Sequence, residues 1–135
     1  MGFGEAVGLF FKNYATFNGR SRRAEYWWPS LMFLLAYLAF FIATAGLSGA
    51  GDAGALIAGL VGVAFLVFGV AIIIPSIAVS IRRLHDRDMS GWWYLLILVP
   101  FGSLVLLIFF VMPGTKGRNK YGPDPKGVPA AETFA

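Results

Sequence analysis

Three long windows of this sequence contain no Asp, Glu, Lys, Arg or His, and they constrain the fold more than any other feature. They cover residues 26–51, 53–81 and 89–115. A helix rises about 1.5 Å per residue, so about 20 mostly apolar residues cross the roughly 30 Å hydrocarbon core of a bilayer. A soluble helix of this length would carry charges on its water-facing side. The windows therefore predict an all-α, polytopic membrane protein.

Within these windows the sequence predicts three transmembrane helices, at about residues 27–47, 55–81 and 92–112. Of the 135 residues, 13% are charged, whereas roughly a quarter are charged in soluble domains. We expect one integral membrane domain over residues 1–126 and a disordered tail at 127–135.

An amphipathic segment precedes the first span, at about residues 3–17. Aromatic and aliphatic residues recur there at helical spacing, with Glu5 and Lys12 on other faces. The segment is too short to cross a bilayer, which predicts a helix lying in the headgroup region. Packing of this helix on the cytoplasmic end of the bundle is the alternative, and the two are compatible.

Small residues recur along the second predicted span. Gly54, Ala58 and Gly62 are spaced four apart, which lets helix backbones approach closely in lipid. We interpret them as helix-packing residues within the chain, with a seam between copies as the alternative. Near the end of the same span, Pro75 lacks an N–H and predicts a kink that frees a carbonyl about one turn earlier.

The third predicted span is the least regular. Trp92 and Trp93 open it, as interfacial aromatic residues often do. Pro100-Phe101-Gly102 interrupts its middle, so the segment crosses with a kink or breaks into two half-helices. Each arm would then have about 9–10 residues and reach roughly 15 Å, half the hydrocarbon core.

The distribution of Lys and Arg predicts the orientation, because these residues collect on the cytoplasmic side. With the N-terminus inside and three spans, seven of the eleven Lys and Arg are cytoplasmic, against four for the reverse. We therefore predict a cytoplasmic N-terminus. A third segment that turned back at Pro100 would place all eleven inside.

Two charged blocks, residues 20–28 and 82–93, share this predicted cytoplasmic face. Each has arginines, a serine and then a tryptophan pair. Interface anchoring explains most of this composition. Asp86 also follows Arg82 by four residues and Arg83 by three, within pairing reach on a helix. The candidate contacts with lipid or a partner are Arg20, Arg22, Arg23, Glu25, Trp27, Arg82, Arg83, His85, Asp86, Trp92 and Trp93.

Other chemistry has little support in the sequence. There is no cysteine and a single histidine, His85, without HExxH spacing or a GxSxG motif. Metal ligands, cofactor-binding residues and catalytic residues are therefore not predicted, and His85 is interpreted as a structural group. The span interiors lack the ionisable residues typical of coupled transport. The basic residues form short juxtamembrane blocks, which argues against nucleic-acid binding.

Several motifs, in this order, resemble the bacterial family called domain of unknown function 805. They are FNGRSRRAEYW at 17–27, RRLHD at 82–86, SGWW at 90–93, Pro100 and NKYGPDP at 119–125. The resemblance covers about residues 8–126, and it departs at 87–89, where smaller or glycine-containing residues are expected. It implies a small protein of the bacterial inner (plasma) membrane, and it implies no established activity, substrate or cofactor.

The sequence thus predicts a small inner-membrane protein with a structural role, or one that binds lipid or a partner through a cytoplasmic arginine–aromatic face. Two alternatives remain open. One is an oligomeric transporter or channel subunit assembled along Gly54, Ala58 and Gly62. The other is a membrane enzyme acting on lipid headgroups around His85 and Asp86. The expected partners are membrane lipids, including anionic headgroups, and a second copy or another membrane protein.

Overall fold

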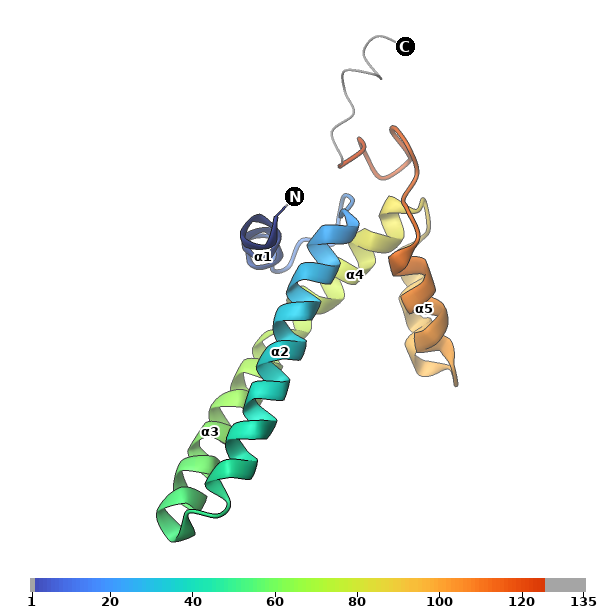
Figure 1. Cartoon of the computed structure of the whole chain (residues 1–135). Helices are drawn as coiled ribbons and strands as arrows, with labels where there is room; N and C mark the ends of the chain where they lie inside the picture. The colour runs from blue at the N-terminus through green and yellow to red at the C-terminus, as the bar shows by residue number, and fades with distance from the viewer. Residues whose placement is uncertain (1, 126–135) are drawn as a thin grey trace. The chain divides into compact units, whose positions relative to one another are not determined.

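The computed structural model describes residues 2–125, and the regular secondary structure of this part is helical, apart from one isolated bridge between Asn119 and Gly122. The elements are α1 (Phe3–Lys12), α2 (Arg23–Leu47), α3 (Gly51–Ala71), α4 (Ile73–Asp86), a 3-10 helix η1 (Gly91–Leu98) and α5 (Gly102–Val111) (Figure 1). The all-α prediction is confirmed. The predicted disordered tail at 127–135 lies outside the described residues.

The chain divides into two compact units, one from Met1–Pro29 with Ile74–Ala135 and the other from Ser30–Ile73. The second unit is a hairpin of the apolar parts of α2 and α3. Two helical stretches, Arg23–Leu47 and Gly51–Asp86, are long and apolar enough to cross a membrane. They coincide with the first two predicted spans. Their most apolar windows are not buried within the protein, as expected for side chains that face lipid.

Aromatic side chains, more than small residues, join the two helices of the hairpin. Phe40 and Phe65 stack with their ring centroids 4.5 Å apart. Of the predicted packing residues, Gly54 is buried against the Leu47 carbonyl, where a Cβ would collide with backbone. A Cβ on Gly62 would meet nothing within 4 Å. A close backbone approach is therefore present at Gly54, near the turn of the hairpin, and is not present at Gly62.

Pro75 acts as the sequence predicts. The α-helical run is interrupted at Ile72, between α3 and α4, and Ala71 is the residue whose carbonyl would otherwise accept the missing N–H of Pro75. Pro75 is itself buried in the third position of α4. A proline is tolerated in the first turn of a helix, where its N–H would have no intrahelical partner.

The third predicted span is not one helix over 92–112. It breaks into η1 and α5, as in the half-helix alternative, with Val99, Pro100 and Phe101 between them. Val99 is extended, as residues before proline prefer, and Phe101 takes a left-handed φ of 63°. Gly102 then approaches Leu96 so closely that a Cβ would collide with the Leu96 backbone. The chain thus reverses direction, and η1 and α5 pack against each other.

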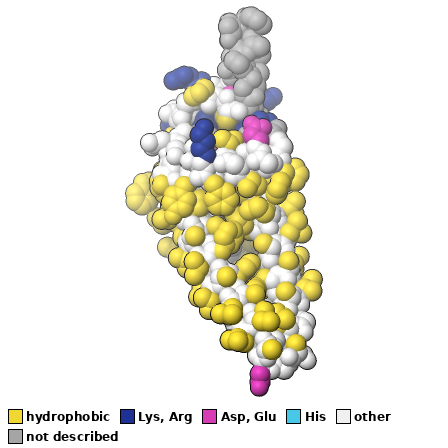
Figure 2. All heavy atoms as spheres, turned by 90° about the vertical axis from the view of Figure 1, so that its left-hand side faces the viewer, with side chains coloured by type: hydrophobic (Ala, Val, Ile, Leu, Met, Phe, Trp, Pro, Cys, Tyr) yellow, Lys and Arg dark blue, Asp and Glu magenta, His cyan; other side chains and the backbone are white. Residues whose placement is uncertain are grey.

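Apolar side chains dominate the outer surface of the helices. On the face drawn in Figure 2, hydrophobic side chains cover most of the helical surface, and Lys and Arg side chains lie outside this zone. Ile42, Leu66 and Phe101 are 73%, 68% and 80% exposed. A soluble protein rarely exposes so large an apolar surface, whereas lipid accommodates it.

Candidate functional site

A buried group of two arginines and one aspartate lies where α4 ends. Arg20 and Arg83 each form an ion pair with Asp86, at 2.9 and 2.7 Å, and all three side chains are at most 3% exposed. We call these three residues the arginine clamp. Buried charges are stable only when nearly all of their hydrogen-bonding groups are satisfied. The remaining donors of the clamp therefore show what it holds.

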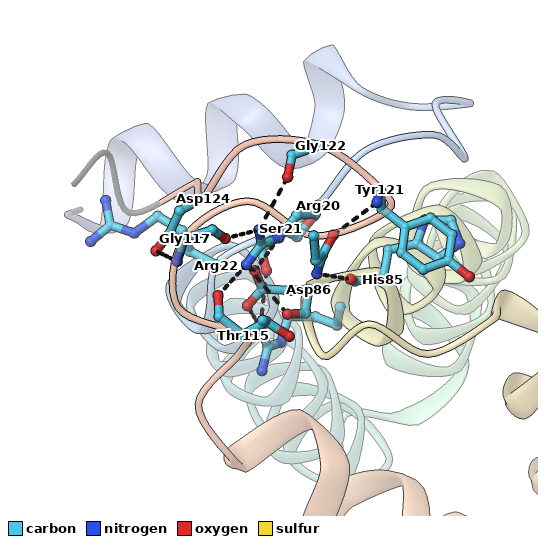
Figure 3. A network of polar contacts seen from close by, with 12 residues as sticks. Arg20, Ser21, Arg22, His85, Asp86, Thr115, Gly117, Tyr121, Gly122 and Asp124 are labelled. Carbon is cyan, nitrogen blue, oxygen red and sulfur yellow. Dashed lines mark hydrogen bonds and ion pairs between the residues drawn. The ribbon is translucent and has the colours of Figure 1, made fainter. Parts of the chain in front are cut away.

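Arg20 holds the segment that follows α5. Its guanidinium donates to the carbonyl oxygens of Thr115, Gly117 and Gly122, as well as to the Asp86 carboxylate (Figure 3). The Thr115 N–H donates to the Asp86 carbonyl at 2.7 Å. The segment from Thr115 to Gly122 thus curves around one arginine side chain. It lies on the same face as the end of α4 and the segment before α2.

Arg83 holds the end of α5. It donates to the carbonyls of Phe110 and Met112 at 3.1 and 2.9 Å, and to the Ser21 carbonyl at 2.9 Å. The last carbonyls of a helix have no intrahelical partner and carry partial negative charge, so a cation is favourable there. The Trp27 indole N–H also donates to the Phe110 carbonyl, at 3.1 Å. The C-terminus of α5 is therefore fixed beside α4 and the start of α2.

Arg82 holds the segment between α1 and α2. It donates to Ser21 Oγ at 2.8 Å and to the carbonyls of Asn13 and Thr16 at 3.0 and 2.7 Å. Glu25 is buried at 6% exposure, and its carboxylate accepts from the Arg22 backbone N–H at 3.4 Å. This second group orders the connection from α1 to α2 by hydrogen bonds to backbone carbonyls.

His85 lies on the other side of the same helix end. Its ring stacks on Tyr121, with centroids 3.9 Å apart and planes within 4°. Nδ1 is 2.9 Å from the Gly19 carbonyl, which can only accept, so Nδ1 carries the proton. In the neutral imidazole this arrangement leaves Nε2 as a hydrogen-bond acceptor.

The structure brings some of the predicted contact residues together and leaves others apart. Asp86 pairs with Arg83, three residues earlier, and with Arg20, whereas Arg82 forms no ion pair with Asp86 in the part of the chain that the structure describes. Arg20, Arg82 and Arg83 are occupied within the chain. Arg23 is exposed and donates to the Val111 carbonyl at 3.2 Å. Trp92 and Trp93 lie on η1, 79% and 49% exposed.

Sequence reasoning did not single out the residues after α5 as part of this site. Gly114 lies against Asp86, where a Cβ would collide with the carboxylate. Asn119 donates from its side chain to the His85 carbonyl at 3.0 Å and accepts from the Tyr121 N–H at 2.8 Å. The motif NKYGPDP at 119–125 contains Asn119 and Tyr121 and is the sequence signal that marks this segment.

The geometry of the clamp favours support of the fold over catalysis. Both carboxylate oxygens of Asp86 accept from arginines, so the group is poorly placed to act as a general base or to orient His85. Within residues 2–125, no group of three or more His, Cys, Asp or Glu side chains could hold a metal ion. What the site does is join four segments of the chain on one face.

Comparison with known proteins agrees with this picture of a membrane protein. A family model described as "Protein of unknown function (DUF805)" matches residues 14–123. Inner membrane protein YhaH of Escherichia coli (strain K12) is 43% identical over 116 residues, covering 85% of this chain and 91% of the relative. Inner membrane protein YhaI of the same strain is 44% identical over 127 residues, covering 85% and 90%. No solved structure matches the chain.

Proposed function

From the premise that this chain belongs to the DUF805 family, whose relatives include inner membrane proteins, we propose a structural, lipid-associating role at the cytoplasmic face of the membrane. In this proposal the arginine clamp holds the fold together, and the basic side chains outside it contact anionic lipid. The observation that carries the proposal is the separation of these two sets of basic residues.

The inner set is committed to the protein itself. The side chains of Arg20 and Arg83 are 1% and 0% exposed, and most of their donors go to Asp86 and to backbone carbonyls, although the buried Arg83 Nε has no partner among the described residues. A guanidinium in this state would have to break several charge-assisted hydrogen bonds before it could bind a lipid phosphate. A ligand role for these two arginines is therefore unfavourable, and a role in stability is supported.

The outer set is free to meet a membrane surface. It consists of five exposed basic residues, which we call the basic rim: Lys12, Arg23, Lys116, Arg118 and Lys120. Basic residues near an anionic leaflet contribute about 1 kcal/mol each to the attraction, and salt screens it. Exposed aromatic residues such as Trp92 belong at the same depth. Together these features support contact with an anionic lipid surface.

The same contacts support an orientation with both ends of the described chain in the cytoplasm. The turn between α2 and α3 has no Lys or Arg, whereas α1, the end of α4 and the segment after α5 carry them. The bonds from Arg20 to Thr115 and Gly117 tie that last segment to the residues before α2. We propose two full crossings, α2 and Gly51–Asp86, with η1 and α5 as a re-entrant pair. All eleven Lys and Arg would then be cytoplasmic, in keeping with the positive-inside rule.

The lipid role is tested by neutralising part of the basic rim. Lys12→Gln, Lys116→Gln and Arg118→Gln together remove three exposed charges from side chains outside the clamp. We expect the ratio of phosphatidylglycerol to phosphatidylethanolamine retained by the purified protein to fall about tenfold at low salt, less than the simple sum of three such charges because of screening. Lipid mass spectrometry of protein from mixed-lipid nanodiscs measures this ratio.

The matched control keeps the charges at the same positions, as Lys12→Arg, Lys116→Arg and Arg118→Lys. It should retain the wild-type ratio. At 1 M salt, where the Debye length is about 3 Å, the neutralised variant and the control should retain phosphatidylglycerol and phosphatidylethanolamine in the same ratio. An unchanged ratio in the neutralised variant at low salt would remove the basis for the proposed lipid role.

A further inference from the structure

Two neighbouring hollows lie beside η1, and neither belongs to the arginine clamp. The first has a volume of about 360 Å³, and His85, Ser90, Trp92 and Tyr121 are among its lining residues. The second, of about 350 Å³, is lined by Ser90, Trp92, Trp93, Leu95, Leu96 and Val99. Ser90 and Trp92 line both hollows, so the two adjoin. One end of the combined hollow is polar, and the other is apolar.

The polar end offers a defined hydrogen-bond acceptor. His85 is 9% exposed, and its Nδ1–H is committed to the Gly19 carbonyl. Nε2 lies on the side of Gly91, which also lines the first hollow, at 3.6 Å from where a Cβ on Gly91 would be. Among the described residues no hydrogen-bond donor is recorded for Nε2. A ligand that donates a hydrogen bond would therefore find an acceptor held in place by the stacked Tyr121 ring.

The apolar end follows η1 from Trp92 to Val99. Leu95 and Val99 are 51% and 53% exposed beside it. A 3-10 helix rises about 2 Å per residue, so the seven steps from Trp92 to Val99 extend roughly 14 Å, close to the thickness of one hydrocarbon leaflet. The groove thus has the length and the apolar lining that an acyl chain requires. The indoles at its mouth have the character of headgroup-level side chains.

We propose that these hollows form a seat for one glycerophospholipid whose headgroup donates a hydrogen bond. The headgroup lies against His85 Nε2 and Ser90, and one acyl chain lies along η1. Lys120 lies beside this end, with its Nζ 5.3 Å from the centroid of the Tyr121 ring, and would face the lipid phosphate. Ethanolamine and glycerol headgroups both supply the required donor, whereas the quaternary ammonium of choline does not. This inference rests on the proposed placement of the face at the membrane surface.

The test is native mass spectrometry of the full chain released from nanodiscs that contain equal amounts of phosphatidylethanolamine, phosphatidylglycerol and phosphatidylcholine. The wild type should retain one phosphatidylethanolamine or phosphatidylglycerol about tenfold more often than phosphatidylcholine. His85→Asn keeps a donor near the Nδ1 position and loses the acceptor at Nε2, so it should abolish this preference. His85→Gln can place an oxygen near Nε2 and should restore most of it.

Tryptophan variants test the apolar end separately. Trp92→Ala should reduce retention of all three lipids, because Trp92 lines both hollows, and its 79% exposure makes misfolding a poor explanation. Trp28→Ala, at an exposed tryptophan that lines neither of these two hollows, should leave retention unchanged. Equal retention of phosphatidylcholine by the wild type, or a preserved preference in His85→Asn, would overturn the proposal.

The rim variant separates this inference from the proposed lipid role. Neutralising Lys12, Lys116 and Arg118 should leave the single bound phosphatidylethanolamine in place, because that lipid has no net charge. If only phosphatidylglycerol were retained, and the rim variant removed it, the seat would be rejected and the electrostatic role would stand. If phosphatidylethanolamine were seated and the rim variant had no effect on phosphatidylglycerol, the opposite conclusion would follow.

Discussion

Asp86→Asn should lower the free energy of unfolding by about 3–5 kcal/mol, the usual cost of breaking a buried ion pair from one side. The substitution keeps the shape of the side chain but removes the only acidic partner in the arginine clamp. Arg20 and Arg83 would then remain buried, at 1% and 0% side-chain exposure, without the carboxylate that pairs with both of them. Denaturant titration in neutral micelles, followed by circular dichroism, measures the change.

Asp88→Asn is the matched control for this prediction. Asp88 is an exposed acid two residues later, with a left-handed φ of 61° that asparagine also tolerates. Its substitution should change the unfolding free energy by no more than about 0.5 kcal/mol. Equal effects of the two substitutions would show that the clamp does not stabilise the fold.

Gly102→Ala should lower the free energy of unfolding by about 2–3 kcal/mol, toward the upper end of the range for overpacking. The added Cβ would collide with the backbone of Leu96, which cannot move aside as a flexible side chain can. The turn from η1 to α5 would have to open, and the bonds from Arg83 to Phe110 and Met112 would weaken with it. The same micelle titration measures this loss.

Ser103→Ala provides the control at the next position. Ser103 is exposed, and alanine is a good helix former, so its substitution should be close to neutral. Cysteine accessibility at Thr115→Cys adds a local readout. It should increase in Gly102→Ala and stay at the background level in Ser103→Ala. A Gly102→Ala protein with wild-type stability would mean that η1 and α5 do not approach as closely as described.

The helical class and the first two apolar helices could be predicted from the sequence, because each follows from one local property of the chain. Long windows without charges have few solutions other than helices in lipid. Pro75 predicts an interruption of the helix, because it lacks the backbone N–H that would bond to the carbonyl four residues earlier. The pairing of Asp86 with Arg83 follows from helical spacing alone. These are local features, and local reasoning reaches them.

The conformation of the third predicted span and the hydrogen-bond partners of the arginines depend on long-range contacts. Composition and length fit a single span as well as two half-helices. What separates these two solutions is the set of bonds from Arg20 and Arg83 to carbonyls in 110–122. Backbone carbonyls are common to all residues, so no side-chain pattern marks them as partners. For the same reason, arginines that the sequence predicts to contact lipid donate instead to backbone carbonyls inside the protein.

The central claim is that the arginine clamp keeps the segment after α5 on the same side of the membrane as the residues before α2. The most direct measurement fuses alkaline phosphatase or green fluorescent protein to the C-terminus of the full chain in bacterial cells. The proposed topology, with both ends in the cytoplasm, predicts bright fluorescence from the second fusion and no phosphatase activity from the first. An active phosphatase fusion with a dark fluorescent fusion would place the C-terminus outside and contradict it.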